Sequence, residues 1–380
     1  MKILMGDPLI YEGVITVGSH HYANLFLEHQ HDVFWLGGAL HPLNLLRAAL
    51  GNPHHRELAQ LWRRGVQTVR PRLMTYHPLT LLPYRKFPLL DTLWVLRHSL
   101  DFSVPSVRRV LAQHGFEQPD ALWLTHSHYG LSLLAQVRYG KLLYRIADRF
   151  TEFAGVPKSM DAGDDEIIAR ADTVFVTARQ LYDEVRQKGG DKVVYLPNGV
   201  NFPHFHIANP VEPADIAAIP RPRILYVGMI AEWFDTELLL RAAAALPTYS
   251  FILVGPSRIP LDALKAAPNI HVMGGRPFAA MPHYMHACDV GIMPFKKTAL
   301  TQTISPIKIF EYLASGLATV SVRLHELESL ASPTLLTDTA DDFIDAIRQA
   351  VQGGRGHKAF IDFAEANSWE QRYRLIASRL

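Results

Sequence analysis

The sequence has a single cysteine, Cys288, among 380 residues. One cysteine excludes an internal disulfide framework and a metal cluster built from cysteine alone. No uncharged apolar run reaches the roughly 18 residues of a membrane-spanning helix, and the apolar start of the chain is too short for a signal peptide. We therefore expect a soluble protein in a reducing cytoplasm.

Several nucleotide and metal signatures are also missing. Dehydrogenases need GxGxxG, which lets the backbone approach a pyrophosphate, and neither Gly6 nor Gly228 opens that spacing. A Walker loop, HExxH, CxxC and a DxD pair are absent as well. These absences disfavour a nicotinamide enzyme, a P-loop ATPase and a metal-dependent nucleotidyl site, so we expect neither a cofactor nor a bound metal.

Apolar residues are plentiful. They make up 48% of the chain, and with a mean hydropathy of +0.03 they supply enough surface for large cores and exclude a disordered protein. The length is typical of two domains.

The net charge is small, 38 basic minus 36 acidic residues or +2, but it is unevenly distributed. Residues 47–109 hold eleven Lys and Arg against three acids, a balance of +8, which leaves −6 for the rest of the chain. The same segment is rich in aromatic residues, and residues 89–100 (LLDTLWVLRHSL) form an amphipathic helical pattern. This pattern fits peripheral contact with an anionic membrane, such as the inner face of the plasma membrane. It equally fits a helix packed on a core. No recognised motif suggests nucleic acid.

Short apolar runs alternate with helical patterns, which is typical of parallel sheets covered by helices and predicts an α/β fold of two doubly wound domains. The predicted strands cover residues 2–5, 32–36, 121–125, 141–147, 173–177 and 193–196, then 223–228, 250–254, 269–273, 290–294, 318–322 and 334–336. The predicted helices cover residues 19–29, 130–138, 164–170 and 180–188, then 236–245, 261–266, 281–287, 306–315 and 341–352.

The middle of the chain, residues 203–222, holds five prolines and no clear periodicity, which predicts a linker. We therefore expect an N-terminal domain at 1–202 and a C-terminal domain at 223–366. Residues 367–380 are predicted to form a last helix that crosses back to the first domain. Ligands of such sheets bind in the crevice beyond the carboxyl ends of the strands.

The most informative segment is TISPIKIFEYLASG, residues 303–316. Ser305 is a natural N-cap, Pro306 fits the first helical position, and Gly316 fits the C-cap. Such a helix start is a ready anion site, since it exposes backbone amides and a partial positive charge. Lys308 lies in the first turn, where a bound phosphate would stabilise it, and Glu311 lies one turn further on, where it could accept hydrogen bonds from ribose. The alternative is a solvated ion pair between the two.

Taken in order, seven segments of the chain resemble bacterial GT-B glycosyltransferases that build exopolysaccharide and teichuronic-type polymers, the xanthan-type glucuronosyltransferase in particular. The segments are residues 144–148 (YRIAD), 196–200 (LPNGV), 224–228 (ILYVG), 269–277 (NIHVMGGRP), 289–295 (DVGIMPF), 305–316 (SPIKIFEYLASG) and 368–370 (SWE). The resemblance implies a GT-B fold of two Rossmann-like domains, with the acceptor on the first and a nucleotide-sugar donor on the second.

The resemblance also implies the donor contacts. Lys308 would meet the diphosphate and Glu311 the ribose, within the donor-binding segment that includes Ser305 and Ile307. Gly228 and Met229 would lie against the phosphates, and Arg276 and Phe295 would border the base. Alternatives remain for the last two, because Arg276 also fits a solvated loop arginine and Phe295 a core aromatic.

Asp148 is the candidate catalytic base, because it follows a predicted strand and occupies the aspartate position of the YRxxD pattern. A carboxylate there could take the proton from an acceptor hydroxyl. The alternative roles are an N-cap or an ion pair with Arg145 or Arg149. Thr303 stands where retaining relatives carry a second glutamate, which favours inversion at the anomeric carbon.

Two histidine pairs, His20 with His21 and His126 with His128, follow predicted strands and could line the acceptor side. Alternatively, they satisfy loop backbone. Their spacing is not that of a metal site.

We therefore expect a metal-independent glycosyltransferase that moves a sugar from a UDP-sugar, such as UDP-glucuronate or UDP-glucose, to a hydroxyl of a glycan or a lipid-linked acceptor. Two alternatives share the fold. A UDP-sugar 2-epimerase would interconvert nucleotide sugars without an acceptor, and a non-catalytic scaffold at the membrane would bind UDP without turnover.

Overall fold

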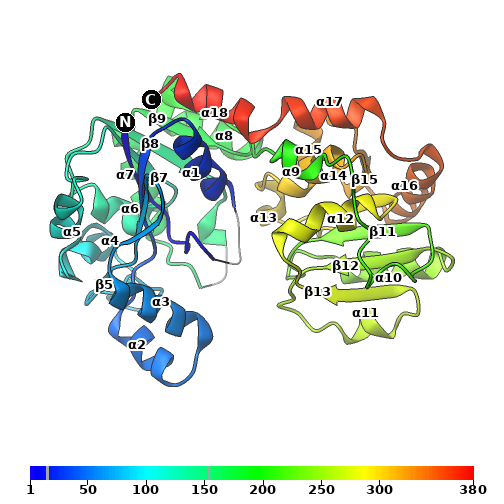
Figure 1. Ribbon diagram of the computed structural model, residues 1–380, viewed down its shortest axis with the longest axis horizontal. Coiled ribbons are helices and arrows are strands. Elements are labelled where there is room, and N and C mark those ends of the chain that lie inside the picture. The colour runs from blue at the N-terminus through cyan, green and yellow to red at the C-terminus, as the bar shows by residue number, and fades with distance from the viewer. Residues whose placement is uncertain (14–16, 153–154) are drawn as a thin grey trace. The chain divides into compact units, whose positions relative to one another are not determined.

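The computed structural model describes residues 1–13, 17–152 and 155–380. They form two compact units (Figure 1). Unit 1 comprises Met1–Leu196 together with Tyr373–Leu380, and unit 2 comprises Pro197–Arg372. Each unit has its own hydrophobic core.

Unit 1 is built on an eight-stranded sheet in the order β10-β9-β8-β7-β1-β2-β4-β3, parallel except for the antiparallel β3–β4 pair. The strands are β1 (Lys2–Gly6), β2 (Asp32–Leu36), β3 (Gln67–Arg70), β4 (Leu73–Tyr76), β7 (Ala121–Leu124), β8 (Lys141–Ile146), β9 (Thr173–Val176) and β10 (Val193–Tyr195). β7 and β9 are buried at every residue, as expected of parallel strands covered on both faces. Leu79–Thr80 (β5) pairs with Ser103–Val104 (β6) apart from the main sheet.

The helices of unit 1 connect these strands in chain order. They are α1 (Gly18–Glu28), α2 (Pro42–Ala49), α3 (Pro53–Arg64), α4 (Leu93–His98), α5 (Val107–Gln113), α6 (Ser127–Leu133), α7 (Met160–Arg170) and α8 (Arg179–Gly189). At the end of the chain, Tyr373 is 4% exposed, its ring stacks on His29 at 4.1 Å, and its hydroxyl lies 3.1 Å from His31 Nε2. These contacts attach the last residues to unit 1.

Unit 2 holds a fully parallel six-stranded sheet in the order β13-β12-β11-β14-β15-β16. Its strands are β11 (Arg223–Val227), β12 (Ser250–Val254), β13 (Ile270–Gly274), β14 (Val290–Met293), β15 (Ala318–Val322) and β16 (Leu335–Thr337). Its helices are α9 (Phe202–Phe205), α10 (Thr236–Ala245), α11 (Asp262–Ala266), α12 (Met281–His286), α13 (Ala299–Gln302), α14 (Ile307–Ala314), α15 (His325–Ser329), α16 (Ala340–Gly353) and α17 (Lys358–Ala366). The last helix, α18 (Trp369–Ala377), starts in unit 2 and ends in unit 1.

The predicted α/β architecture is confirmed, with a parallel sheet in each unit. Each of the twelve predicted strands has a counterpart. The prediction missed the strands β3, β4, β5 and β6, and it included no helix for α2, α3, α5, α9, α13, α15 or α17. QTVR in β3 is polar, and β5 and β6 have two residues each, too few to leave a sequence pattern. The prediction also placed the helix of residues 130–138 too late, since α6 begins at Ser127.

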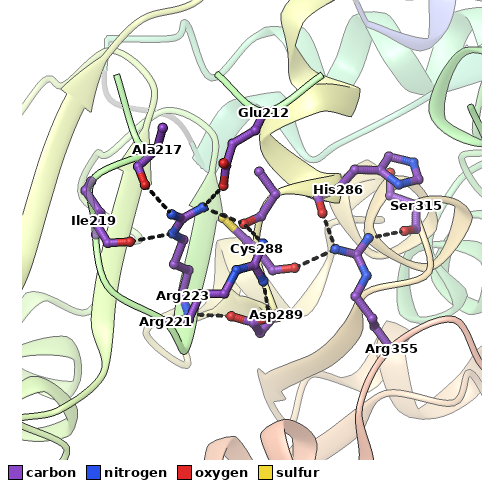
Figure 2. Close-up of polar contacts among 11 residues, drawn as sticks. Glu212, Ala217, Ile219, Arg221, Arg223, His286, Cys288, Asp289, Ser315 and Arg355 are labelled. Atoms are coloured by element: carbon purple, nitrogen blue, oxygen red, sulfur yellow. Dashed lines mark hydrogen bonds and ion pairs between the residues drawn. The ribbon is translucent and has the colours of Figure 1, made fainter. Parts of the chain in front are cut away.

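The segment predicted as a linker, residues 203–222, lies inside unit 2. Arg223, 3% exposed, holds it in place (Figure 2): its guanidinium pairs with Glu212 and donates to the carbonyls of Ala217 at 3.1 Å and Ile219 at 2.8 Å. Ile216 is fully buried in the core. The prolines therefore shape a packed segment of unit 2, and a composition typical of linkers misled the prediction.

The LPNGV segment has a structural role in unit 2. Val200 N donates to Asn367 O at 3.2 Å, and Trp369 N donates back to Val200 O at 3.0 Å. A Cβ on Gly199 would lie 2.8 Å from Asn367 O, so the close approach of the two backbones requires glycine. This contact joins two of the segments that carry the family resemblance.

The amphipathic segment 89–100 is only partly helical. Thr92 caps α4, whose Val95 and Leu96 are buried, so the prediction of a longer helix was wrong at its start. Leu89 lies outside the helix and is 87% exposed, and Trp94 is 56% exposed. Burial of Val95 and Leu96 confirms the alternative of a helix packed on a core, while contact of the exposed side chains with a membrane stays a prediction. Within the described residues, no helix is both long and apolar enough to cross a bilayer.

Candidate functional site

The start of α14 is the centre of the candidate site in unit 2. Pro306 is its N-cap and provides no side-chain cap, so the prediction of Ser305 as N-cap was wrong by one residue. Ser305 accepts two hydrogen bonds from Asn198. The backbone N–H of Asn198 donates to Ser305 Oγ at 3.2 Å, and its Nδ2 donates to Ser305 O at 2.7 Å. The first amides of α14, from Ile307 onward, thus have no side-chain cap, which suits an anionic ligand. The predicted C-cap was also wrong by one residue: Ser315 is the C-cap, and Gly316 follows it at φ +70°, the conformation that ends a helix.

Lys308 and Glu311 form an ion pair with 2.6 Å between Nζ and Oε2, but the pair is largely buried and not solvated as the predicted alternative had it. The Glu311 side chain is 3% exposed and that of Lys308 is 29% exposed. The buried carboxylate offsets the unfavourable position of a cation in the first turn of a helix. An ammonium has three donors and a carboxylate about four acceptor positions, so the pair retains capacity for a ligand.

Gly228 and Met229 follow β11 directly and lie beside α14. Val227 N donates to the buried hydroxyl of Tyr312 at 2.7 Å, which ties the end of β11 to α14. The loop is held by Tyr226, whose hydroxyl donates to Met229 O at 2.8 Å. The structure therefore ties the end of β11, which Gly228 and Met229 follow, to α14. Sequence reasoning missed Tyr312 as a positioning residue, although it lies within the segment of residues 303–316.

A second glycine permits this loop. Gly255, at φ +153°, follows β12, and a Cβ there would lie 1.8 Å from Gly228 O. No side chain fits such a contact between backbones. Sequence reasoning missed Gly255, whose only local signal is its place after a predicted strand.

Arg276 and Phe295 are occupied by other contacts within unit 2. The Arg276 guanidinium pairs with Asp215 at 2.7 Å and donates to Tyr284 Oη at 2.9 Å and to Met273 O at 2.6 Å. Hydrogen bonding to Asp215, then to Tyr284, raises the pKa of Arg276. Phe295 is 8% exposed and its ring meets Tyr226 edge-on at 6.3 Å. Phe295 is thus a core aromatic in this structure, whereas Arg276 is an anchored arginine and not a freely solvated one.

Asp148 lies just beyond the carboxyl end of β8 in unit 1 and is half-buried. Burial raises the pKa of Asp148 to about 6, although the charge of Arg145 opposes the shift. Arg149, one of its predicted partners, pairs with Glu184 instead. A carboxyl group with this pKa is ionised near pH 7 and retains useful basicity.

Asp164 is a second perturbed carboxyl group in unit 1, which sequence reasoning missed. Burial raises its pKa to about 6, against hydrogen bonds from Ser127 and Tyr144. Tyr144 Oη donates to Asp164 Oδ1 at 2.6 Å. These donors assign Asp164 to positioning α7 against β8 and α6.

The histidine pairs differ in their surroundings. His20 is 3% exposed, with Nδ1 accepting from Val17 N at 3.3 Å and Nε2 lying 3.2 Å from Ile10 O, so it satisfies loop backbone. His21 is 8% exposed within α1. His126 and His128 instead line a cavity of about 480 Å³ in unit 1. Burial lowers the pKa of His126 to about 4 and that of His128 to about 3, so both rings are neutral at pH 7.

Across residues 1–13, 17–152 and 155–380, no group of three or more His, Cys, Asp or Glu side chains is placed to hold a metal ion. Cys288 is buried, and burial raises its pKa to about 12.

Comparison with known proteins gives two matches at the level of sequence. Residues 221–353, within unit 2, match the family model of glycosyl transferases group 1. Over 227 residues the chain is 30% identical to the putative teichuronic acid biosynthesis glycosyltransferase TuaH of Bacillus subtilis (strain 168). That match covers 55% of this chain and 57% of TuaH, so the chain spans little more than half the length of this relative.

Many solved structures match, and the following three do so over nearly the whole chain. Sucrose-phosphate synthase from Thermosynechococcus elongatus has a TM-score of 0.66 at 16% identity, covering 100% of this chain and 98% of that one. Anabaena HepE in complex with UDP-glucose has a TM-score of 0.64 at 14% identity, with coverage of 100% and 98%. The E. coli trehalose-6-phosphate protein bound with UDP-2-fluoro glucose has a TM-score of 0.67 at 12% identity, with coverage of 100% and 99%. At these identities the likeness shows a shared fold.

Proposed function

We propose that this chain, which has the GT-B fold and contains a group 1 glycosyltransferase domain in unit 2, transfers a sugar from a UDP-sugar to a hydroxyl of an acceptor. The acceptor is a glycan or a lipid-linked glycan in polysaccharide or cell-envelope biosynthesis. The observation that carries the proposal is the start of α14, which has no side-chain cap and holds Lys308 in its first turn. The solved complexes of HepE with UDP and with UDP-glucose support uracil as the base of the donor and UDP-glucose as one donor.

In this proposal the α14 amides and Lys308 bind the donor diphosphate, while Gly228 and Met229 border it. Glu311 accepts hydrogen bonds from the ribose with the oxygen positions that Lys308 leaves free. The same groups stabilise the negative charge that develops on the departing diphosphate. Arg276 and Phe295 border the base as parts of a rigid wall.

The chemical step is a single displacement. Asp148 accepts the proton of the acceptor hydroxyl, the oxygen forms a bond to the anomeric carbon, and the bond from that carbon to UDP breaks. A carboxylate nucleophile on the donor side would be needed for a covalent retaining route. Thr303 has no carboxylate to offer, and its hydroxyl donates to Leu300 O at 3.0 Å. We therefore propose inversion, with either UDP-glucuronate or UDP-glucose as donor.

A thermal-shift panel tests the donor. A ligand that binds only the folded state at 100 times its Kd stabilises it by about 2.7 kcal/mol, so UDP or a UDP-sugar should raise Tm by about 5 °C or more. ADP, GDP and CDP at equal concentration are the matched controls. Absence of a uridine-specific shift would contradict the proposal.

Product analysis separates the alternatives. A 2-epimerase would convert a UDP-sugar into its epimer in the absence of acceptor, which NMR detects, and a scaffold would bind UDP without turnover of any acceptor. The glycosyltransferase releases UDP only when an acceptor is present.

We further propose that the cytoplasmic protein contacts an anionic membrane through the segment of residues 47–109 and its flanks. Of the twelve large hydrophobic side chains that the described structure exposes, nine lie between residues 43 and 104. They share that stretch with the +8 charge balance of residues 47–109. Exposed apolar groups beside basic ones suit insertion among anionic headgroups.

Vesicle co-sedimentation tests this contact. Phe87→Ser/Leu89→Ser removes two side chains that are 65% and 87% exposed, and should weaken binding to phosphatidylglycerol vesicles about tenfold or more. Val211→Ser, which changes a residue 69% exposed in unit 2, should bind as wild type does. Equal binding by all three proteins would refute the membrane contact at this segment.

A further inference from the structure

The cavity of about 480 Å³ in unit 1 is lined by basic, imidazole, aromatic and apolar side chains, with no acid among the lining residues that the structure describes. Its polar lining consists of Tyr84, Arg85, Lys86, His126 and His128. We infer that this cavity binds the phosphate or diphosphate group of a lipid-linked acceptor. The inference rests on the proposed function, and it names the chemical class of the acceptor.

Charge is the first argument. Arg85 Nη2 donates to Asn44 Oδ1 at 3.0 Å, which uses one of the five N–H donors of the guanidinium. Burial, and then the charge of Arg47, lowers the pKa of Arg85, the direction expected of a cation without a carboxylate partner. Lys86, beside it in sequence, is exposed. Two cations at one cavity favour a ligand of more than one negative charge.

Unused hydrogen-bonding capacity is the second argument. His128 Nε2 is buried and has no hydrogen-bond partner among the residues that the structure describes. Its ring is held between Tyr129, stacked at 4.2 Å, and Tyr84, edge-on at 5.1 Å. A buried polar atom without a partner costs free energy unless a ligand or water satisfies it. The neutral ring can donate an N–H to a phosphate oxygen in its Nε2–H tautomer.

The acids behind the cavity wall are bound to protein donors. Asp7 acts electrostatically on His126, and three further carboxylates act on Tyr84. Each accepts from a nearby group: Asp7 from Thr125 at 2.8 Å, Asp91 from Ser159 Oγ at 2.6 Å, Asp161 from Thr151 at 2.8 Å and Asp164 from Tyr144 at 2.6 Å. Each carboxylate therefore has a protein donor of its own, although Asp91 also acts electrostatically on Lys86.

The surroundings of the cavity point to an anion with a hydrocarbon chain. In the sequence, Arg85 and Lys86 are followed by Phe87 and Leu89, whose side chains are 65% and 87% exposed. Leu81, which precedes them, is 56% exposed. An amphiphile matches this sequence of cations followed by exposed apolar side chains, whereas a free phosphate would use only the cations.

The cavity also lies on the side of unit 1 that holds Asp148. Arg145 acts electrostatically on both Asp148 and His126, so the proposed base and one cavity residue share a neighbour. Phe150, two residues after Asp148, lines the cavity and its ring centroid lies 3.6 Å from that of His126. A lipid diphosphate bound here would place the attached sugar near the base.

Isothermal titration with three probes tests the inference: farnesyl diphosphate below its micelle concentration, inorganic pyrophosphate and farnesol. Farnesyl diphosphate should bind most tightly, and Arg85→Gln/Lys86→Gln should weaken it about 10- to 100-fold. Arg63→Gln/Arg64→Gln is the matched control, because it removes the same charge from two exposed residues outside the cavity. Lys86→Glu, a change at an exposed position, repeats the test without risk to folding.

Three results would overturn the inference: unchanged binding in both cavity variants, an equal loss in the control, or farnesol binding as tightly as its diphosphate. Pyrophosphate binding as tightly as farnesyl diphosphate would overturn the lipid part. UDP affinity, measured in the same proteins, tests the donor site separately. Loss of UDP binding with farnesyl diphosphate binding intact would refute the proposed function while leaving the cavity assignment.

Discussion

Asp148→Asn should lower kcat about 10²- to 10⁴-fold, which is the usual contribution of a positioned general base. The amide has nearly the same shape but cannot accept the proton of the acceptor hydroxyl. The Kd for UDP should stay within about twofold, because the proposed diphosphate contacts all lie in unit 2. A time course of UDP release measures kcat, and isothermal titration with UDP measures the Kd.

The pH profile gives an independent readout of the same group. The pKa of Asp148 is raised to about 6, so the carboxylate form dominates above that value and the rate should fall as pH drops below it. Because folding raises this pKa, the charged carboxylate opposes folding near pH 7, and the asparagine variant should lose no stability there. A variant with wild-type kcat, or a wild-type rate that is flat through pH 6, would remove Asp148 from the mechanism.

Lys308→Ala/Glu311→Gln should raise the Kd for UDP about 10- to 100-fold, the range for a lost hydrogen bond between charged groups. The double change is required because Glu311 is 3% exposed, and removal of the lysine alone would leave a buried unpaired carboxylate. Isothermal titration measures the loss.

Uridine separates the two contacts. Glu311→Gln should weaken both uridine and UDP, whereas the further loss of Lys308 should affect only UDP, since uridine has no phosphates. Lys297→Ala is the matched control, because Lys297 pairs with Asp338 in the same unit outside the proposed diphosphate site. An unchanged Kd for UDP in the double variant would exclude α14 as the diphosphate site.

Much of the fold could be predicted because parallel sheets leave a strong local signal. Strands such as β12 (SFILV) and β14 (VGIM) are buried at every residue, so each appears in sequence as a mostly apolar run. The hairpin β3–β4 lacks this signal, because it adds an edge to the sheet with alternating burial in QTVR. Edge strands depend on their neighbours more than on their own composition.

The candidate site was predictable in its chemistry and less so in its contacts. The spacing of Lys308 and Glu311 places them one turn apart in any helix, and the structure pairs them. Ser305 illustrates the limit. Its local pattern predicts an N-cap, but its hydroxyl accepts a hydrogen bond from Asn198, which is more than a hundred residues away in the sequence. No local pattern reports a competitor so distant in sequence.

The sequence by itself determined which segments become strands and helices, and where Gly316 ends α14, since periodicity and backbone conformation act over a few residues. Only the tertiary structure decided the rest: Arg223 fixing residues 203–222 onto unit 2, the burial that raises the pKa of Asp148, and the cavity that gathers Arg85, His126 and His128. These properties arise from groups far apart in the chain, and their distances and desolvation exist only once folding has brought them together.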